Sequence, residues 1–116
     1  MPKKLIRENV AENIKNSKRK ENEIEIILDQ KELNNLYELK IQEELNEIKS
    51  SEYNDIYEFV DLIHAAFCFA EQNGFSPEEI VNAMNKKGSE KGFFSNVALN
   101  NLNPKNLSNK IYFENE

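Results

Sequence analysis

The sequence predicts an all-α fold of three main helices and a short N-terminal helix. Apolar residues recur at three- and four-residue intervals over long blocks, which is the spacing of amphipathic helices. Glycine and proline are scarce, with 3 of each in 116 residues, so few positions interrupt these blocks. The one alternating stretch, residues 23–26, favours a brief extended piece rather than a sheet.

The first two helices follow from local signals. Residues 3–14 are basic and then weakly amphipathic, which favours the short N-terminal helix. Asp29 with Glu32 three positions later is typical of a capping box, because the first acid accepts a backbone N–H that the helix leaves unpaired. This signal predicts a helix over about 30–49.

The next two helices have equally local boundaries. The serines at 50–51 end the first long helix, and a second is expected over 54–73. Gly74 then stands where a left-handed residue closes a helix. Residues 76–79, SPEE, are typical of a helix start, with serine as the cap and proline in the first turn. This third long helix is expected to fade near 86–88.

Residues 98–116 differ from the rest of the chain. They are rich in asparagine, contain Pro104 and show no sustained period, so we expect a tail that is loosely ordered or packed on a neighbour. Residues 1–97 then form the domain. Three helices of this length cover one another incompletely, so we expect oligomerisation, as a homodimer or a higher homo-oligomer, to complete the core.

Composition excludes several classes of function. The net charge of -6, from 15 basic and 21 acidic residues, argues against nucleic-acid binding. A single cysteine and a single histidine exclude an internal disulfide, a CxxC zinc site and histidine-rich metal chemistry. No apolar run is long enough for a membrane span or a signal peptide, so we expect a soluble cytoplasmic protein. Acidic residues must carry any catalysis.

Acidic residues lie on the apolar face of the first long helix. Glu44 falls near the centre of this face, and Glu47 is its neighbour three positions later. An ionised carboxylate on a buried face is costly unless it is paired or bound to a metal. One interpretation is that Lys40, one turn earlier, pairs with Glu44 and that the other acids are solvated.

The second long helix repeats this arrangement. Glu58 and Asp61 are three positions apart, and residues 61–70 are apolar almost all round, which indicates burial on two sides. Two such acid pairs on antiparallel helices can meet, and four carboxylates favour Mg²⁺ or Mn²⁺. A di-iron site would need a second histidine besides His64. His64 itself is expected in the core or an interface, and Cys68 as a packed apolar residue.

Three elements of the sequence resemble one known family. Residues 40–47, KIQEELNE, and 58–61, EFVD, resemble the K-x-x-E-E-x-x-E and E-x-x-D motifs of MazG-like all-α nucleoside triphosphate pyrophosphohydrolases. Residues 4–10, KLIRENV, are similar to the K-L-V-R-D-K-I-P opening of the phosphoribosyl-ATP pyrophosphohydrolase-like branch. Residues 87–94, KGSEKGFF, are similar to its K-x-x-x-R-G-G-F element. The resemblance covers about residues 3–97.

The resemblance implies a MazG-like helical bundle and an activity. A nucleoside triphosphate would be hydrolysed between the α- and β-phosphates with Mg²⁺ (or Mn²⁺), giving a monophosphate and pyrophosphate, and nucleotide-pool cleansing is the role this suggests. The residues that match the family's metal ligands are Glu44, Glu47, Glu58 and Asp61. The candidate phosphate contacts are Lys4, Arg7, Lys87 and Lys91.

Further roles follow from position. Glu44 or Glu47 would accept the proton of the attacking water, Lys40 would hold the acids or reach phosphate, and Glu43 would orient the metal ligands. The sequence departs from the family pattern at Ala11, Lys91 and Phe93, where the family has Pro, Arg and Gly. Two alternatives therefore stay open: a phosphoribosyl-ATP pyrophosphohydrolase, and a catalytically silent helical module that binds a nucleotide or a protein.

Overall fold

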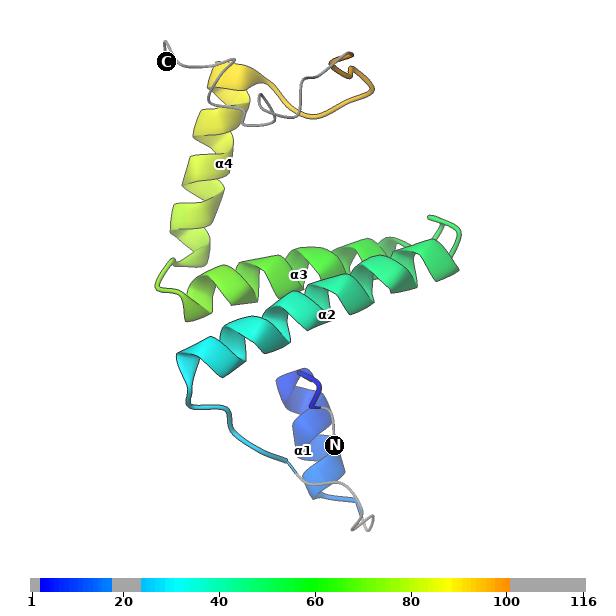
Figure 1. Ribbon diagram of the computed structural model, residues 1–116, viewed down its shortest axis with the longest axis vertical. Helices are drawn as coiled ribbons and strands as arrows, with labels where there is room; N and C mark the ends of the chain where they lie inside the picture. The colour runs from blue at the N-terminus through cyan, green and yellow to red at the C-terminus, as the bar shows by residue number, and fades with distance from the viewer. Residues whose placement is uncertain (1–2, 18–23, 101–116) are drawn as a thin grey trace. The chain divides into compact units, whose positions relative to one another are not determined.

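The described part of the chain is entirely helical. The computed structural model describes residues 3–17 and 24–100, and over these residues it has four helices and no strand (Figure 1). The helices are α1 (Glu8–Lys15), α2 (Gln30–Ser50), α3 (Ile56–Gln72) and α4 (Pro77–Lys91). The all-α class with a short N-terminal helix is confirmed.

The chain divides into two compact units, Met1–Asn82 and Ala83–Glu116. The first unit contains the helices α1, α2 and α3, and the division falls inside α4. Most of the predicted tail, residues 98–116, lies outside the described residues, so its character stays a prediction. Among the helices that the structure describes, none has the length and apolar content needed to cross a membrane.

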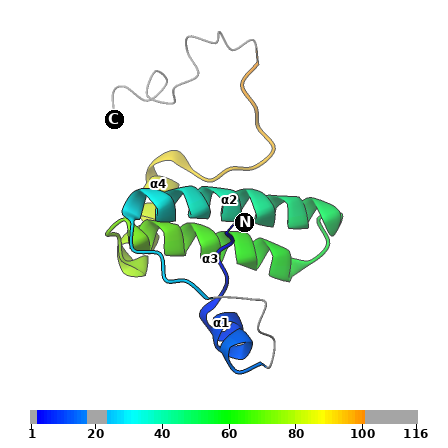
Figure 2. The same cartoon turned by 60° about the horizontal axis from the view of Figure 1, so that its bottom comes forward.

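The helices α2 and α3 form an antiparallel hairpin. They lie side by side in both views of the chain (Figures 1 and 2), joined by a turn in which Glu52 and Tyr53 adopt left-handed backbone conformations. The Asp29 carboxylate accepts the Glu32 backbone N–H at 2.9 Å, as predicted. The Asp55 carboxylate starts α3 in the same way, accepting the Tyr57 N–H at 2.9 Å.

The hairpin has a thin core. Leu36 and Ile48, 8% and 3% exposed, are the buried apolar side chains among the described residues. Tyr37 and Phe69 add a parallel ring stack across the hairpin, with ring centroids 5.2 Å apart. No described residue of α3 is buried within the single chain, so the predicted burial of 61–70 on two sides is absent from this monomer. The contact between α2 and α3 covers only one face of each helix.

The start of α4 is as predicted, but its end is not. Ser76 and Glu79 exchange hydrogen bonds, each side chain accepting the other's backbone N–H at 3.1 and 3.0 Å. These bonds hold the pKa of the Glu79 carboxyl below its ordinary value. The helix continues past 86–88 to Lys91, and the Phe93 ring lies against Gly88, where an added Cβ would be 2.5 Å from the ring. Gly92, at φ +77°, then ends it.

The segment before α1 is tied to the hairpin by ion pairs. The Lys3 ammonium contacts the carboxylates of Glu25 at 2.7 Å and Glu32 at 2.5 Å. The Lys4 ammonium lies 2.7 Å from Glu43 on α2. Residues 3–7 are non-helical, so this short extended piece carries its basic side chains along the hairpin toward the acids of α2 and α3.

Candidate functional site

Three of the four predicted metal ligands come together. Glu44 of α2 and Glu58 and Asp61 of α3 each offer a carboxylate oxygen, and these oxygens all lie within 4.8 Å of one another. Glu44 is 6% exposed and the other two are half-buried. Glu47 lies outside this group in the structure and is exposed, although its charge acts on Glu58. We call Glu44, Glu58 and Asp61 the acid group.

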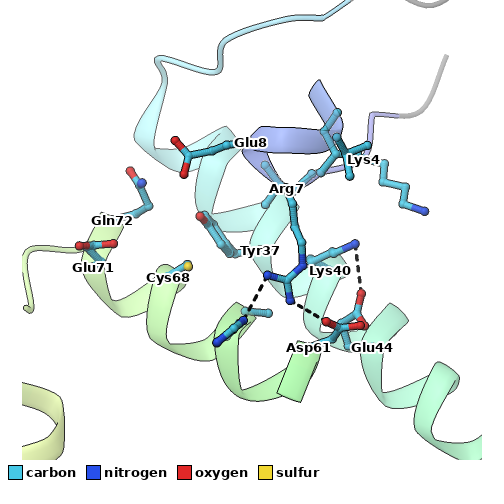
Figure 3. A pocket seen from close by; sticks show the side chains of 15 residues that line it. Lys4, Arg7, Glu8, Tyr37, Lys40, Glu44, Asp61, Cys68, Glu71 and Gln72 are labelled. Carbon is cyan, nitrogen blue, oxygen red and sulfur yellow. Dashed lines mark hydrogen bonds and ion pairs between the residues drawn. The ribbon is translucent and has the colours of Figure 1, made fainter. Parts of the chain in front are cut away.

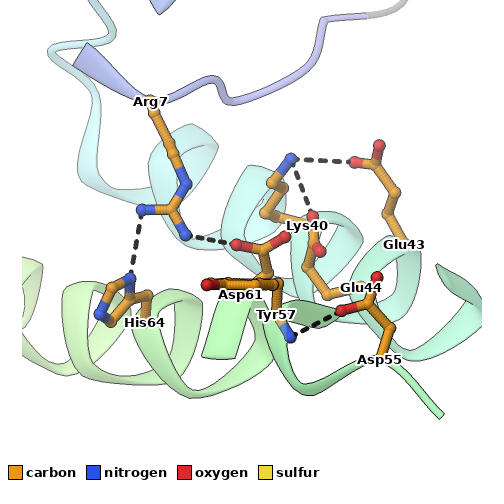
Figure 4. A network of polar contacts seen from close by, with 8 residues as sticks. All are labelled: Arg7, Lys40, Glu43, Glu44, Asp55, Tyr57, Asp61 and His64. Atoms are coloured by element: carbon orange, nitrogen blue, oxygen red, sulfur yellow. Dashed lines mark hydrogen bonds and ion pairs between the residues drawn. The ribbon is translucent and has the colours of Figure 1, made fainter. Parts of the chain in front are cut away.

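Lys40 neutralises the most buried member of the acid group. Its ammonium lies 3.1 Å from a Glu44 oxygen and 3.3 Å from a Glu43 oxygen (Figure 4). The predicted pairing of Lys40 with Glu44 is therefore present, and Lys40 bridges two neighbouring acids rather than one. The Lys4 hydrogen bond, with help from Lys40, lowers the pKa of the Glu43 carboxyl, and the same contact raises the pKa of Lys4.

Arg7 brings a second cation to the acid group from the N-terminal segment. One guanidinium nitrogen lies 2.6 Å from the Asp61 carboxylate, and another lies 3.1 Å from Nδ1 of His64 (Figure 4). Arg7 can donate to this nitrogen when His64 is the tautomer with its proton on Nε2. His64 is exposed and belongs to the polar network instead of the core. Its position three residues after Asp61 is the sequence signal that could have placed it there.

Glu58 is the acid that the chain leaves least compensated. Among the described residues, no ion pair or hydrogen bond reaches its carboxylate, unlike those of Glu44 and Asp61. Partial burial raises the pKa of the Glu58 carboxyl, and the charges of Asp55, Asp61, Glu47 and Glu44 raise it further. The electrostatic field at this position thus favours the binding of another positive charge.

A cavity adjoins the acid group. It has a volume of about 670 Å³ and is lined by the segment before α1 and by α1, α2 and α3. Lys40, Arg7 and the acids Glu44 and Asp61 stand at one end, and Glu71 and Gln72 stand at the other (Figure 3). A volume between about 300 and 1,000 Å³ is usual for small-molecule sites.

Tyr37 and Cys68 line the middle of this cavity. Both are labelled between its two ends in Figure 3. Partial burial raises the pKa of the Tyr37 hydroxyl, and the charges of Cys68 and Glu71 act in the same direction. Cys68 is exposed on the cavity wall rather than packed in a core, which corrects the expectation made for it.

Of the other predicted phosphate contacts, only Lys4 lies at the cavity among the residues that the structure describes there. Lys4 lines the cavity while it pairs with Glu43. Lys87 and Lys91 belong to the second unit, on the last turns of α4, so their roles as phosphate contacts stay predictions. Glu71 and Gln72 were missed by the sequence analysis. The spacing 61, 64, 68, 71, which keeps one face of a helix, could have identified this side of α3.

The donor set of the acid group has a clear chemical preference. It consists of carboxylate oxygens from two rigid helices, which suits a hard divalent cation such as Mg²⁺ or Mn²⁺ and offers nothing to soft metals. No family model, curated protein or solved structure matches this chain.

Proposed function

We propose that this chain is a Mg²⁺- or Mn²⁺-dependent nucleoside triphosphate pyrophosphohydrolase of the MazG-like kind, acting in nucleotide-pool cleansing. The observation that carries the proposal is the meeting of Glu44, Glu58 and Asp61, two of which, Glu44 and Asp61, line a cavity together with Lys40 and Arg7. Acids for a cation, basic groups for phosphates and room for a nucleoside are the three requirements of this reaction. The order of the resembling motifs adds separate support.

The acid group would hold the cation. Glu47, one turn beyond Glu43 on α2, is exposed and free to turn toward it. When bound, the cation would polarise the phosphate oxygens and lower the pKa of a water. Glu44, or Glu47 once turned toward the cation, would then accept the proton of the attacking water.

The basic residues would act on the phosphates. Arg7 contacts Asp61, and Lys40 contacts Glu44, so both cations already stand at the edge of the acid group. The Arg7 guanidinium presents a planar fork that matches phosphate oxygens, whereas Lys40 supplies a compact charge. His64 would position Arg7 through the contact with its second nitrogen. These groups would offset the charge that develops on the departing pyrophosphate.

A second copy of the chain belongs to this proposal. On α3 the large apolar side chains Ile56, Phe59 and Ile63 are 70%, 41% and 52% exposed, although they lie on one face of the helix. Exposed apolar side chains in a row are typical of an interface. A second copy packing its α3 against this face would complete the thin core of the hairpin.

The product analysis tests the proposal. Purified protein with Mg²⁺ is incubated with a panel of ribo- and deoxynucleoside triphosphates and with phosphoribosyl-ATP, and the products are separated by anion exchange. We expect a monophosphate and pyrophosphate from one or more triphosphates. Turnover of phosphoribosyl-ATP alone would select the narrower enzyme, and binding without turnover would select the silent module. A diphosphate with orthophosphate would contradict cleavage between the α- and β-phosphates.

A further inference from the structure

The two ends of the cavity beside the acid group differ in their basic side chains. Arg7 and Lys40 stand at the end that adjoins the acid group, whereas Glu8, Glu71 and Gln72 stand together at the other end (Figure 3). A phosphate would be repelled by the carboxylates at that far end. The near end also holds Glu44 and Asp61, but the cation of the proposed function would neutralise these acids, and Arg7 and Lys40 add positive charge there. We therefore expect a nucleotide to enter with its phosphates at Arg7 and Lys40 and its base at Glu71.

The wall of α3 sets the distance between the two ends. Asp61, His64, Cys68 and Glu71 recur at intervals of three and four positions and so face the cavity together. Ten residues separate Asp61 from Glu71, which is about 15 Å along a helix axis. An extended nucleotide spans a distance of this order from its phosphates to the far edge of its base. Ala65, also on this wall, leaves room between the ends.

The far end favours a base that donates hydrogen bonds. An ionised carboxylate only accepts, and its two oxygens can accept from two donors side by side. Guanine presents such a pair, the ring N1–H and the 2-amino group, next to the O6 acceptor. Hypoxanthine lacks the 2-amino group, and adenine places a ring acceptor beside its amino group. The Gln72 amide, next to Glu71 on the helix, can donate to O6.

We propose that Glu71 selects guanine nucleotides, with Gln72 as its helper, at the end of the cavity remote from the acid group. This inference rests on the proposed function for the orientation of the phosphates, but it concerns binding of the base. Glu71 is exposed at the surface, so the contact stays partly solvated. We expect a preference of about fivefold for each carboxylate contact, because a solvated hydrogen bond to a charged group contributes modestly.

The test measures binding of products, which avoids turnover. The affinities of GMP, IMP and AMP are measured by titration calorimetry with Mg²⁺ present, on the parent protein and on Glu71→Gln. GMP should bind about fivefold more tightly than IMP, which differs from it only by the amino group. In Glu71→Gln this ratio should fall to about one. The matched control is Glu38→Gln, an exposed acid of α2 that does not line the cavity, and it should keep the parent ratio.

Each outcome decides between the inference and the proposed function. Equal affinities for GMP and IMP in the parent protein, an unchanged ratio in Glu71→Gln, or no binding of the three monophosphates would overturn the inference. Selective binding of GMP without hydrolysis of any triphosphate would support it and refute the proposed activity. Hydrolysis of triphosphates together with equal affinities for GMP and IMP would do the reverse. The comparison of GMP with IMP needs no variant, so it is independent of any loss of folding.

Discussion

The two faces of α3 differ in what the chain provides for them. On the cavity face, Asp61 and His64 are contacted by Arg7, a residue more than 50 positions earlier in the sequence. On the other face, Ile56 and Ile63 are exposed to solvent. Polar groups on the cavity face thus find partners inside one chain, while apolar groups on the other face stay exposed. The acid group and its cations come from one chain, so the second copy that we propose would contribute to stability more than to chemistry.

The largest expected effect is on the cavity face. Asp61→Asn keeps the size of the side chain but removes a charge that would bind the cation and that now holds Arg7. The rate of pyrophosphate release, measured as kcat/KM, should fall at least about 100-fold, because changes even outside the metal ligands cost 10- to 100-fold. Glu38→Gln on α2 serves as the control and should retain full activity. A fully active Asp61→Asn variant would show that catalysis does not depend on the cavity face of α3.

Cation binding should stabilise the fold next most strongly. A ligand that binds the native state alone contributes about 2.7 kcal/mol at 100 times its Kd. Thermal melts with Mg²⁺ or Mn²⁺ should therefore show a higher Tm than melts with a chelator. Glu44→Gln should lose this rise, since it removes the most buried charge of the acid group. If neither cation changes the Tm of the parent protein, the acid group binds no metal and is a solvated surface.

A charge placed on the face of α3 opposite the cavity, which carries Ile56 and Ile63, should affect association of the chain rather than catalysis. Ile63→Lys places an ammonium in the proposed contact between two copies, where desolvation is costly. We expect the Kd of the dimer, measured by sedimentation, to rise at least about tenfold. A tenfold change in Kd corresponds to about 1.4 kcal/mol, and burying an unpaired charge in an interface costs more than that. Melting of the monomer should change little, as Ile63 is exposed there. A parent protein that sediments as a 13.6 kDa monomer would remove the second copy from the proposal.

Local signals explain why the helices could be predicted from the sequence. Asp29, Gly74 and the Ser76–Glu79 box act through hydrogen bonds or backbone conformations within a few residues, and each is found where it was predicted. The end of α4 was expected near 86–88, but the helix continues through Gly88 and ends at Gly92, whose backbone is left-handed. A glycine inside a helix costs stability without having to end it, so the sequence alone does not show which of two nearby glycines closes the helix.

The site was predictable in the same uneven way. Glu44, Glu58 and Asp61 could be assigned because helical spacing alone puts acids on neighbouring faces. Spacing could also have put His64 on the face of Asp61, but the cavity and the contact of His64 with Arg7 could not be predicted, because both depend on where residues 3–7 lie. That position is set by ion pairs such as Lys4 with Glu43, which join segments far apart in the sequence. Spacing groups residues 61, 64, 68 and 71 on one face of α3, but it does not show whether that face lines a cavity or packs in a core.

The smallest expected effect is on the Tm of variants at two acids, Glu58 and Glu43, whose pKa values are shifted in opposite directions. The pKa of Glu58 is raised, first by partial burial and then by neighbouring acids, so the native state holds its proton more tightly than the unfolded chain does. Its ionisation therefore costs stability as pH rises from about 4.3, the ordinary pKa of a glutamate, through the raised value. With a chelator present, Glu58→Gln should raise the Tm at pH 7 and change it little at low pH.

Glu43 should behave in the opposite sense. The hydrogen bond from Lys4 lowers its pKa, so its ionised form contributes stability above the unfolded value, and this contribution is lost as pH falls through the lowered one. Glu43→Gln should therefore lower the Tm at pH 7 and have little effect at low pH. Both carboxyls are substantially solvated, so the shifts in Tm should be small, and it is their opposite signs that circular dichroism melts must resolve. Equal signs at pH 7 would mean that Glu58 has found a cation, in which case the acid group is already compensated by the chain and has no electrostatic need for a metal.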